Sequence, residues 1–147
     1  MKRTALAVIG VMVLAGISTS AHHSHPNFVL DQNVAIEGDI ESVQFKNPHV
    51  LIKLRTAAGT IYTAEWQGAS WFKNRETENR LTDKRYDNRS YTAVTSNTLK
   101  VGDHIVVVGC PARDPALHEL VALKEVRLAR NGWIWEAQEW ARTRALR

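Results

Sequence analysis

The sequence predicts a mostly β protein, built as a small closed antiparallel barrel with one helical or loop insertion after the third strand. Three observations predict this class: short segments alternate apolar and polar residues, turn signals separate them, and one long stretch lacks the alternation. Of the 147 residues, 44% are hydrophobic and 23% are charged, which is close to the globular average and excludes wholesale disorder.

The first predicted strand, residues 34–45, changes phase within its length. Apolar residues and glycine alternate with polar neighbours up to Ile40, and the apolar positions then switch to Val43 and Phe45. A period of two that changes phase predicts a bulge or bend inside one long strand. Asn47-Pro48 then predicts a turn, because proline fixes φ and biases the residue before it away from helix.

The later strands are predicted from alternation and from the turns between them. Ala58-Gly59 is typical of a hairpin turn, and Asn131-Gly132 is the strongest short hairpin signal in the chain. Residues 120–128 fit either strand or helix by periodicity, and the hairpin that follows favours strand. The expected strands after the first are residues 49–55, 60–66, 104–109, 120–128 and 132–135.

Residues 67–100 form the predicted insertion. A helix over residues 69–80 is expected, with Ser70 as N-cap, and a polar loop follows over residues 81–97. About five short strands with one helical interruption after the third fit the oligonucleotide/oligosaccharide-binding (OB) barrel. A small sandwich is the alternative.

The N-terminus reads as a secretory signal peptide. A basic Met1-Lys2-Arg3 start precedes an apolar run over residues 5–17, and Thr19-Ser20-Ala21 supplies a small-residue cleavage site. The run is shorter than the roughly 20 residues a membrane span needs. We therefore expect residues 1–21 to be removed after Ala21 and residues 22–147 to form a single barrel domain, periplasmic or secreted, with no membrane span.

Charge and motifs narrow the function. Loss of Lys2 and Arg3 lowers the formal net charge from +4 to +2, so little steering toward phosphates remains and nucleic acid is not an expected partner. No serine lies in a Gly-x-Ser-x-Gly setting and no carboxylate pair is marked, so catalysis is not indicated. Cys110 ends an apolar run, which predicts a buried and inert thiol.

Histidines are the unusual chemical feature. Three of the six lie directly after the predicted cleavage site, and His49 lies at the Asn-Pro turn. A new N-terminal histidine can bind a metal through its amine, whose pKa is about 7.7–8.0, and through its ring; a further imidazole would give three nitrogens that suit Cu(II). The predicted metal ligands, for copper first and zinc second, are His22, His23, His25 and His49.

Two alternatives stay open for these histidines. Cleavage after Ser20 would start the chain at Ala21-His22-His23 and favour Cu(II) or Ni(II) through the amine, two amides and an imidazole. The histidines could instead belong to a solvated start, as termini are usually poorly ordered. A different function class is a non-metal binding module for a protein, lipid or sugar partner, with aromatic contacts from Trp71, Phe72 and Trp135.

Three motifs carry a family resemblance. In order along the chain they are Ala21-His22-His23-Ser24, Asn47-Pro48-His49-Val50 and Leu99-Lys100-Val101-Gly102-Asp103. Over about residues 21–128 the chain resembles a family of small exported bacterial proteins catalogued as a domain of unknown function. The resemblance implies a small periplasmic β-barrel without an established activity, and it carries over the positions His22, His23 and His49.

Overall fold

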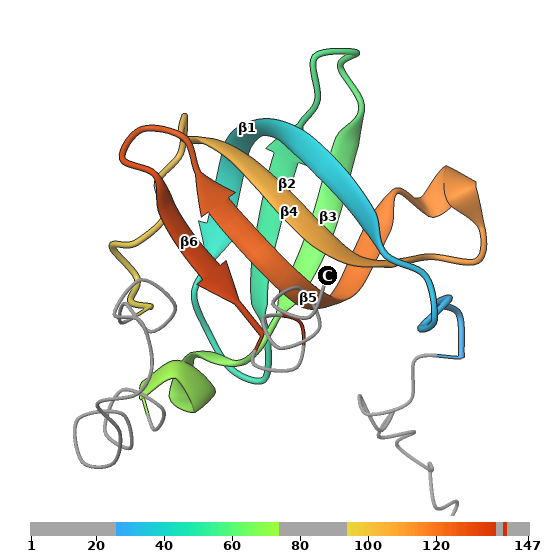
Figure 1. Cartoon of the computed structure of the whole chain (residues 1–147), viewed down its shortest axis with the longest axis horizontal. Coiled ribbons are helices and arrows are strands. Elements are labelled where there is room, and N and C mark those ends of the chain that lie inside the picture. The colour runs from blue at the N-terminus through green and yellow to red at the C-terminus, as the bar shows by residue number, and fades with distance from the viewer. Residues whose placement is uncertain (1–25, 74–93, 138–139, 141–147) are drawn as a thin grey trace, which may run out of the picture.

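The structure is a computed structural model that describes residues 26–73, 94–137 and 140. The strands form one sheet in the order β3-β2-β1-β4-β5-β6, and a further pairing between β3 and β5 closes the first five into a barrel (Figure 1). The strands are β1 (Val34–Gln44), β2 (Val50–Arg55), β3 (Ile61–Trp66), β4 (His104–Pro111), β5 (Glu119–Leu128) and β6 (Trp133–Glu136).

Two short helical segments lie between the strands. Residues 69–73, shortly after β3, are helical, which confirms the start of the predicted helix, but Ser70 is the second residue of this helix and not its N-cap. The rest of the predicted helix and loop lies outside the described residues. A 3-10 turn, η1 (Pro115–Leu117), lies between β4 and β5. Among the residues described, the helical segments are all too short or too polar to cross a membrane.

The predicted bulge in β1 is confirmed. The register of β1 against β2 slips between Ile40 and Ser42, where the apolar positions change phase. The first half of β1 pairs with β4 and the second half with β2, so the bulge falls where the strand passes from one neighbour to the other. Gly38 lies at this crossing, and a Cβ there would approach the carbonyl oxygen of Arg55 to an impossible distance.

The barrel is closed by a parallel pair, although the prediction was an antiparallel barrel. Thr63 and Ala64 of β3 pair in parallel with Glu119 and Leu120 of β5, while every other strand pair is antiparallel. The reason is one of parity. Directions can alternate around a closed ring only if the number of strands is even, so a five-stranded ring must contain a parallel pair.

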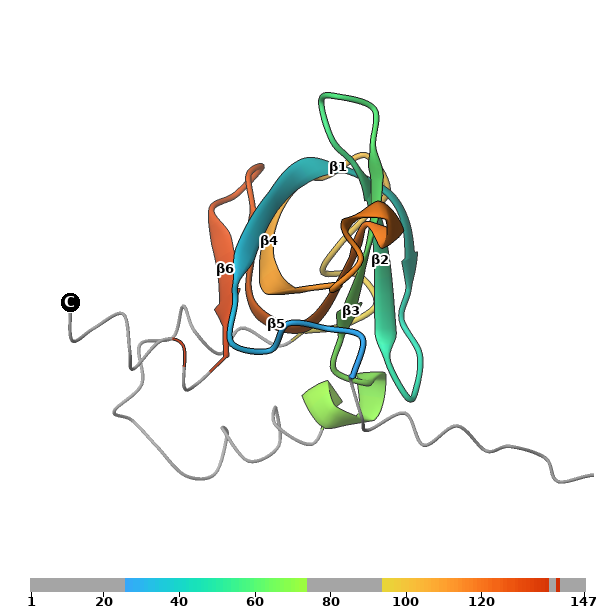
Figure 2. The same cartoon turned by 90° about the vertical axis from the view of Figure 1, so that its right-hand side faces the viewer.

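The core fills this ring and one of its ends. Alternate residues of β2 point inward and are fully buried, and Val50 and Ile52 pair with the buried Trp66 and Ala64 of β3. At the end where β3 stops, the ring of Trp66 packs edge-on against Phe72 at 4.6 Å and against Trp135 at 5.0 Å. Figure 2 shows residues 69–73 at this end and β6 outside the ring.

Two further predictions are confirmed. Asn131-Gly132 forms the hairpin from β5 into β6, with Gly132 at a φ of +70°. Cys110 is buried, and burial raises the pKa of its thiol. Its sulfur lies 3.6 Å from the carbonyl oxygen of Leu30, in the segment that leads into β1. The buried thiol is thus part of the packing between that segment and β4.

Candidate functional site

The candidate site is the corner between β1 and β2, which docks onto the start of the helix after β3. The side-chain oxygen of Asn47 accepts hydrogen bonds from the backbone N–H and the hydroxyl of Ser70, both at 3.0 Å. Gly68 allows the corner to lie close to the start of the helix, because a Cβ there would clash with the carbonyl oxygen of Pro48. The corner is therefore tied to a segment some twenty residues further along the chain.

His49 follows this corner and is held by a carboxylate. Its Nδ1 lies 3.3 Å from Oε1 of Glu65, an outward-facing residue of β3, and the two side chains are 24% and 29% exposed. Nε2 of His49 is shielded from solvent. The imidazole thus has one nitrogen directed at a carboxylate, the arrangement by which proteins commonly orient a metal-binding histidine.

A hollow of about 420 Å³ lies beside this pair, within the range of about 300–1,000 Å³ that is typical of small-molecule sites. Its lining comes from the end of β3, the middle of β5, the corner and the start of the helix. Trp71, which is 36% exposed, belongs to the lining. The lining residues are Pro48, His49, Glu65, Trp66, Gln67, Gly68, Ser70, Trp71, Ala122 and Leu123.

The other predicted metal ligands, His22, His23 and His25, lie outside the described residues. The described chain starts on the β4–β5 connection, where the carbonyl oxygen of Pro26 accepts a 2.9 Å hydrogen bond from Arg113. In Figure 1 this blue segment and the green helix by the corner lie on different sides of the barrel. Within residues 26–73, 94–137 and 140, no three or more His, Cys, Asp or Glu side chains form a group suited to a metal ion.

The three predicted aromatic contacts occupy different environments. Phe72 and Trp135 are only 4% and 5% exposed and pack in the core against Trp66. A ring whose faces are covered by other rings offers little area to a partner. Of these three, Trp71 is the residue with an exposed ring, and it lines the hollow at the corner.

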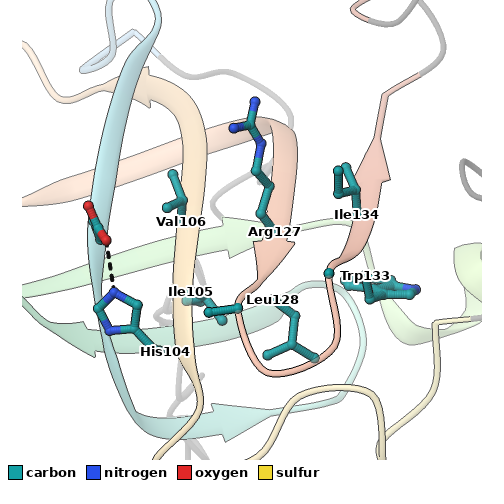
Figure 3. A pocket seen from close by; sticks show the side chains of 10 residues that line it. His104, Ile105, Val106, Arg127, Leu128, Trp133 and Ile134 are labelled. Atoms are coloured by element: carbon teal, nitrogen blue, oxygen red, sulfur yellow. Dashed lines mark hydrogen bonds and ion pairs between the residues drawn. The ribbon is translucent and has the colours of Figure 1, made fainter.

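A second, smaller hollow of about 260 Å³ lies on the outer face of β4, β5 and β6 (Figure 3). Val106, Arg127 and Ile134 lie side by side there, because they are register partners on neighbouring strands. Its lining is mostly apolar, so it offers few groups that could orient a ligand.

His104, at the edge of this second hollow, has a structural role. Its Nε2 lies 2.9 Å from Glu37 and its Nδ1 lies 2.7 Å from Asp39, both on the neighbouring strand β1. These side-chain hydrogen bonds, first from Glu37 and then from Asp39, raise the pKa of His104 above its ordinary value. This cluster has no local signal in the sequence, because two acidic residues two apart on β1 meet His104 only once the register is known.

Comparison with known proteins identifies a family, and that family has no known function. A search of curated proteins found no match. A family model matches residues 10–121, which include the corner, β3 and the β4–β5 connection, and the predicted resemblance to a family of unknown function is confirmed. Because the match covers most of the 147 residues, the chain belongs to the family of unknown function DUF6152.

Proposed function

We propose that the protein is an exported metal-binding barrel, for copper first and zinc second. The single observation that carries the proposal is the contact of 3.3 Å between His49 and Glu65 at the corner. With Nδ1 directed at a carboxylate, the metal would bind at Nε2. The remaining ligands are the predicted group His22, His23 and His25.

The chemistry of the predicted start supports copper. Cleavage after Ala21 gives His22 a free amine, and an amine with a pKa of about 7.7–8.0 loses its proton far more readily than lysine. Amine and imidazole nitrogens from His22, with the ring of His49, would make a three-nitrogen set that suits Cu(II). A set of His23, His25 and His49 with a water would suit Zn(II) instead.

The reach of the chain sets a condition on this site. Pro26 is held on the β4–β5 connection by Arg113. Residues 22–25 can extend about 14 Å from there at most, at roughly 3.5 Å per residue. The metal site therefore requires that the bound metal at His49 lies within this distance of Pro26. Nε2 of His49 is also shielded, so its coordination requires movement of the ring or of its cover and should be slower than coordination at a free amine.

Copper titration of the mature protein with its native N-terminus tests the proposal. A His22→Ala, His23→Ala double variant should lose at least a hundredfold in affinity, and His49→Ala at least tenfold. Glu65→Gln should lose about tenfold, as is typical when the carboxylate partner of a ligating histidine is removed. The control is His104→Gln, because His104 lies at the other hollow and should not affect copper.

Two results would contradict the proposal. One is unchanged copper affinity in the double variant. The other is a mature chain, weighed by mass spectrometry, that starts at neither Ala21 nor His22. Thermal unfolding gives an independent reading, since a metal at 100 times its dissociation constant adds about 2.7 kcal/mol to the stability of the folded state.

A further inference from the structure

We propose that the hollow beside the corner is a binding site for a neutral saccharide, with Trp71 as its stacking surface. The hollow lies at the end of β3, next to the connection between β1 and β2. In OB barrels, ligand sites use the face of strands 2 and 3 and the loop between strands 1 and 2. Analogy of fold gives only the place; the chemistry of the lining gives the ligand.

Trp71 is both accessible and fixed. The residue is 36% exposed, and its ring meets the buried ring of Phe72 edge-on at 5.2 Å. Its backbone N–H donates a 2.9 Å hydrogen bond to the carbonyl oxygen of Gly68. A ring held in this way loses little conformational freedom on binding. Indole presents a flat apolar surface that suits the C–H face of a pyranose.

Gln67 supplies an acceptor that needs a donor. Its Oε1 is buried in the lining of the hollow and has no hydrogen-bond partner within the part of the chain that the structure describes. A buried acceptor without a donor costs free energy, and a ligand hydroxyl would remove that cost. The carboxylate of Glu65 lines the same hollow and accepts hydrogen bonds from hydroxyls equally well.

The charge of the lining excludes anionic ligands. Lysine and arginine are absent from the described residues that line the hollow, whereas Glu65 is present. A nucleotide or phosphorylated ligand would bring its negative charge to that carboxylate without a compensating cation. A purely apolar ligand would leave the Gln67 acceptor unsatisfied. A neutral, hydroxyl-rich ring can stack on Trp71, can donate a hydrogen bond to Gln67 and brings no negative charge to Glu65.

Calorimetric titration of the mature protein with maltotetraose, cellotetraose and tetra-N-acetylchitotetraose tests the proposal. At least one should bind, Trp71→Ala should weaken that binding at least tenfold, and Trp71→Phe should stay within about threefold. Gln67→Met, which keeps the length of the side chain and removes its hydrogen-bonding group, should weaken binding about tenfold. The control is Leu117→Ala, an exposed residue of η1 that does not line the hollow.

The proposal is overturned if none of the three saccharides binds at millimolar concentration, or if tetragalacturonate binds more tightly than they do. It is also overturned if Trp71→Ala binds like the wild type; if that variant does not fold, the same result for Gln67→Met overturns it. The site shares His49 and Glu65 with the metal proposal, and two variants separate them. Trp71→Ala should leave copper affinity unchanged, and the His22→Ala, His23→Ala double variant should weaken copper while saccharide affinity stays within about threefold.

Discussion

Replacing Gly68 with alanine should loosen the corner from the helix after β3. The added Cβ would lie 2.9 Å from Oδ1 of Asn47 and still closer to the carbonyl oxygen of Pro48, whereas real Cβ contacts stay above 3.0 Å. Because the nearer atom belongs to the main chain, the corner itself has to move. Overpacking costs about 1–3 kcal/mol, and the weakened hydrogen bonds between Asn47 and Ser70 add about 1 kcal/mol. The sum is roughly 3 kcal/mol, or about 12 °C in Tm at about 4 °C per kcal/mol.

Thermal unfolding followed by circular dichroism measures this loss, and copper titration shows whether it reaches the site. Gly59→Ala is the matched control. Gly59 lies in the hairpin between β2 and β3 with a φ of +85° and nothing within 4 Å of an added Cβ, so the substitution strains only the local backbone. It should cost about 1 kcal/mol and leave copper affinity unchanged. A Gly68→Ala protein with the Tm and copper affinity of the wild type would refute the reasoning.

Three further predictions concern other parts of the barrel. Hydrogen bonds that the ring of His104 donates, first to Glu37 and then to Asp39, raise its pKa. Its protonated ring therefore stabilises the fold fully below pH 6.5 and less as pH rises through the raised pKa. The destabilisation caused by His104→Gln, measured by urea unfolding, should therefore shrink between pH 5 and pH 9, and should stay below about 1 kcal/mol because the ring is half exposed. The buried Cys110 thiol should react with Ellman's reagent at least a hundredfold more slowly in the folded protein than in urea. Trp140→Phe should destabilise the fold by about 1–2 kcal/mol in urea unfolding, because it removes the N–H that donates to the buried Glu125 at 3.1 Å.

The parts of the fold that the sequence predicts depend on local patterns. The phase change after Ile40 locates the bulge, because a strand with one buried face cannot shift by one residue without turning its apolar side chains outward. Asn131-Gly132 locates the last hairpin, because the positive φ at Gly132 suits a residue without a Cβ. Each of these signals lies within a few residues of the structure that it determines.

The parts that the sequence does not predict depend on contacts between distant residues. The parallel pair of β3 with β5 follows from closure of the whole ring, which has no local signal. Phe72 and Trp135 look like surface aromatics in the sequence, yet both pack on Trp66 at the end of the barrel. Glu125 is only 1% exposed on a strand whose alternation does not mark it, and its partner Trp140 comes from beyond β6.

The candidate site is predicted from the sequence only in part. His49 is identifiable in the sequence, because Asn47-Pro48 predicts a turn that the next residue follows. Its partner Glu65 requires the register of β2 against β3, in which Val50 pairs with Trp66 and so brings the preceding histidine near the end of β3. The sequence therefore identifies His49 as a candidate ligand, and the structure shows that Glu65 is the carboxylate that orients it.

The stability of the docked corner should determine the affinity for both proposed ligands. The corner positions His49 and borders the hollow that His49 and Trp71 line, and its docking on the helix requires Gly68. If Gly68→Ala leaves only a fraction of molecules with the corner docked, the apparent dissociation constant rises by the inverse of that fraction. Copper that uses His49 and a saccharide in the hollow should then weaken by the same factor, because both sites depend on the docked corner. Copper held by the N-terminal residues alone would not weaken, so this one substitution shows whether the corner belongs to the metal site.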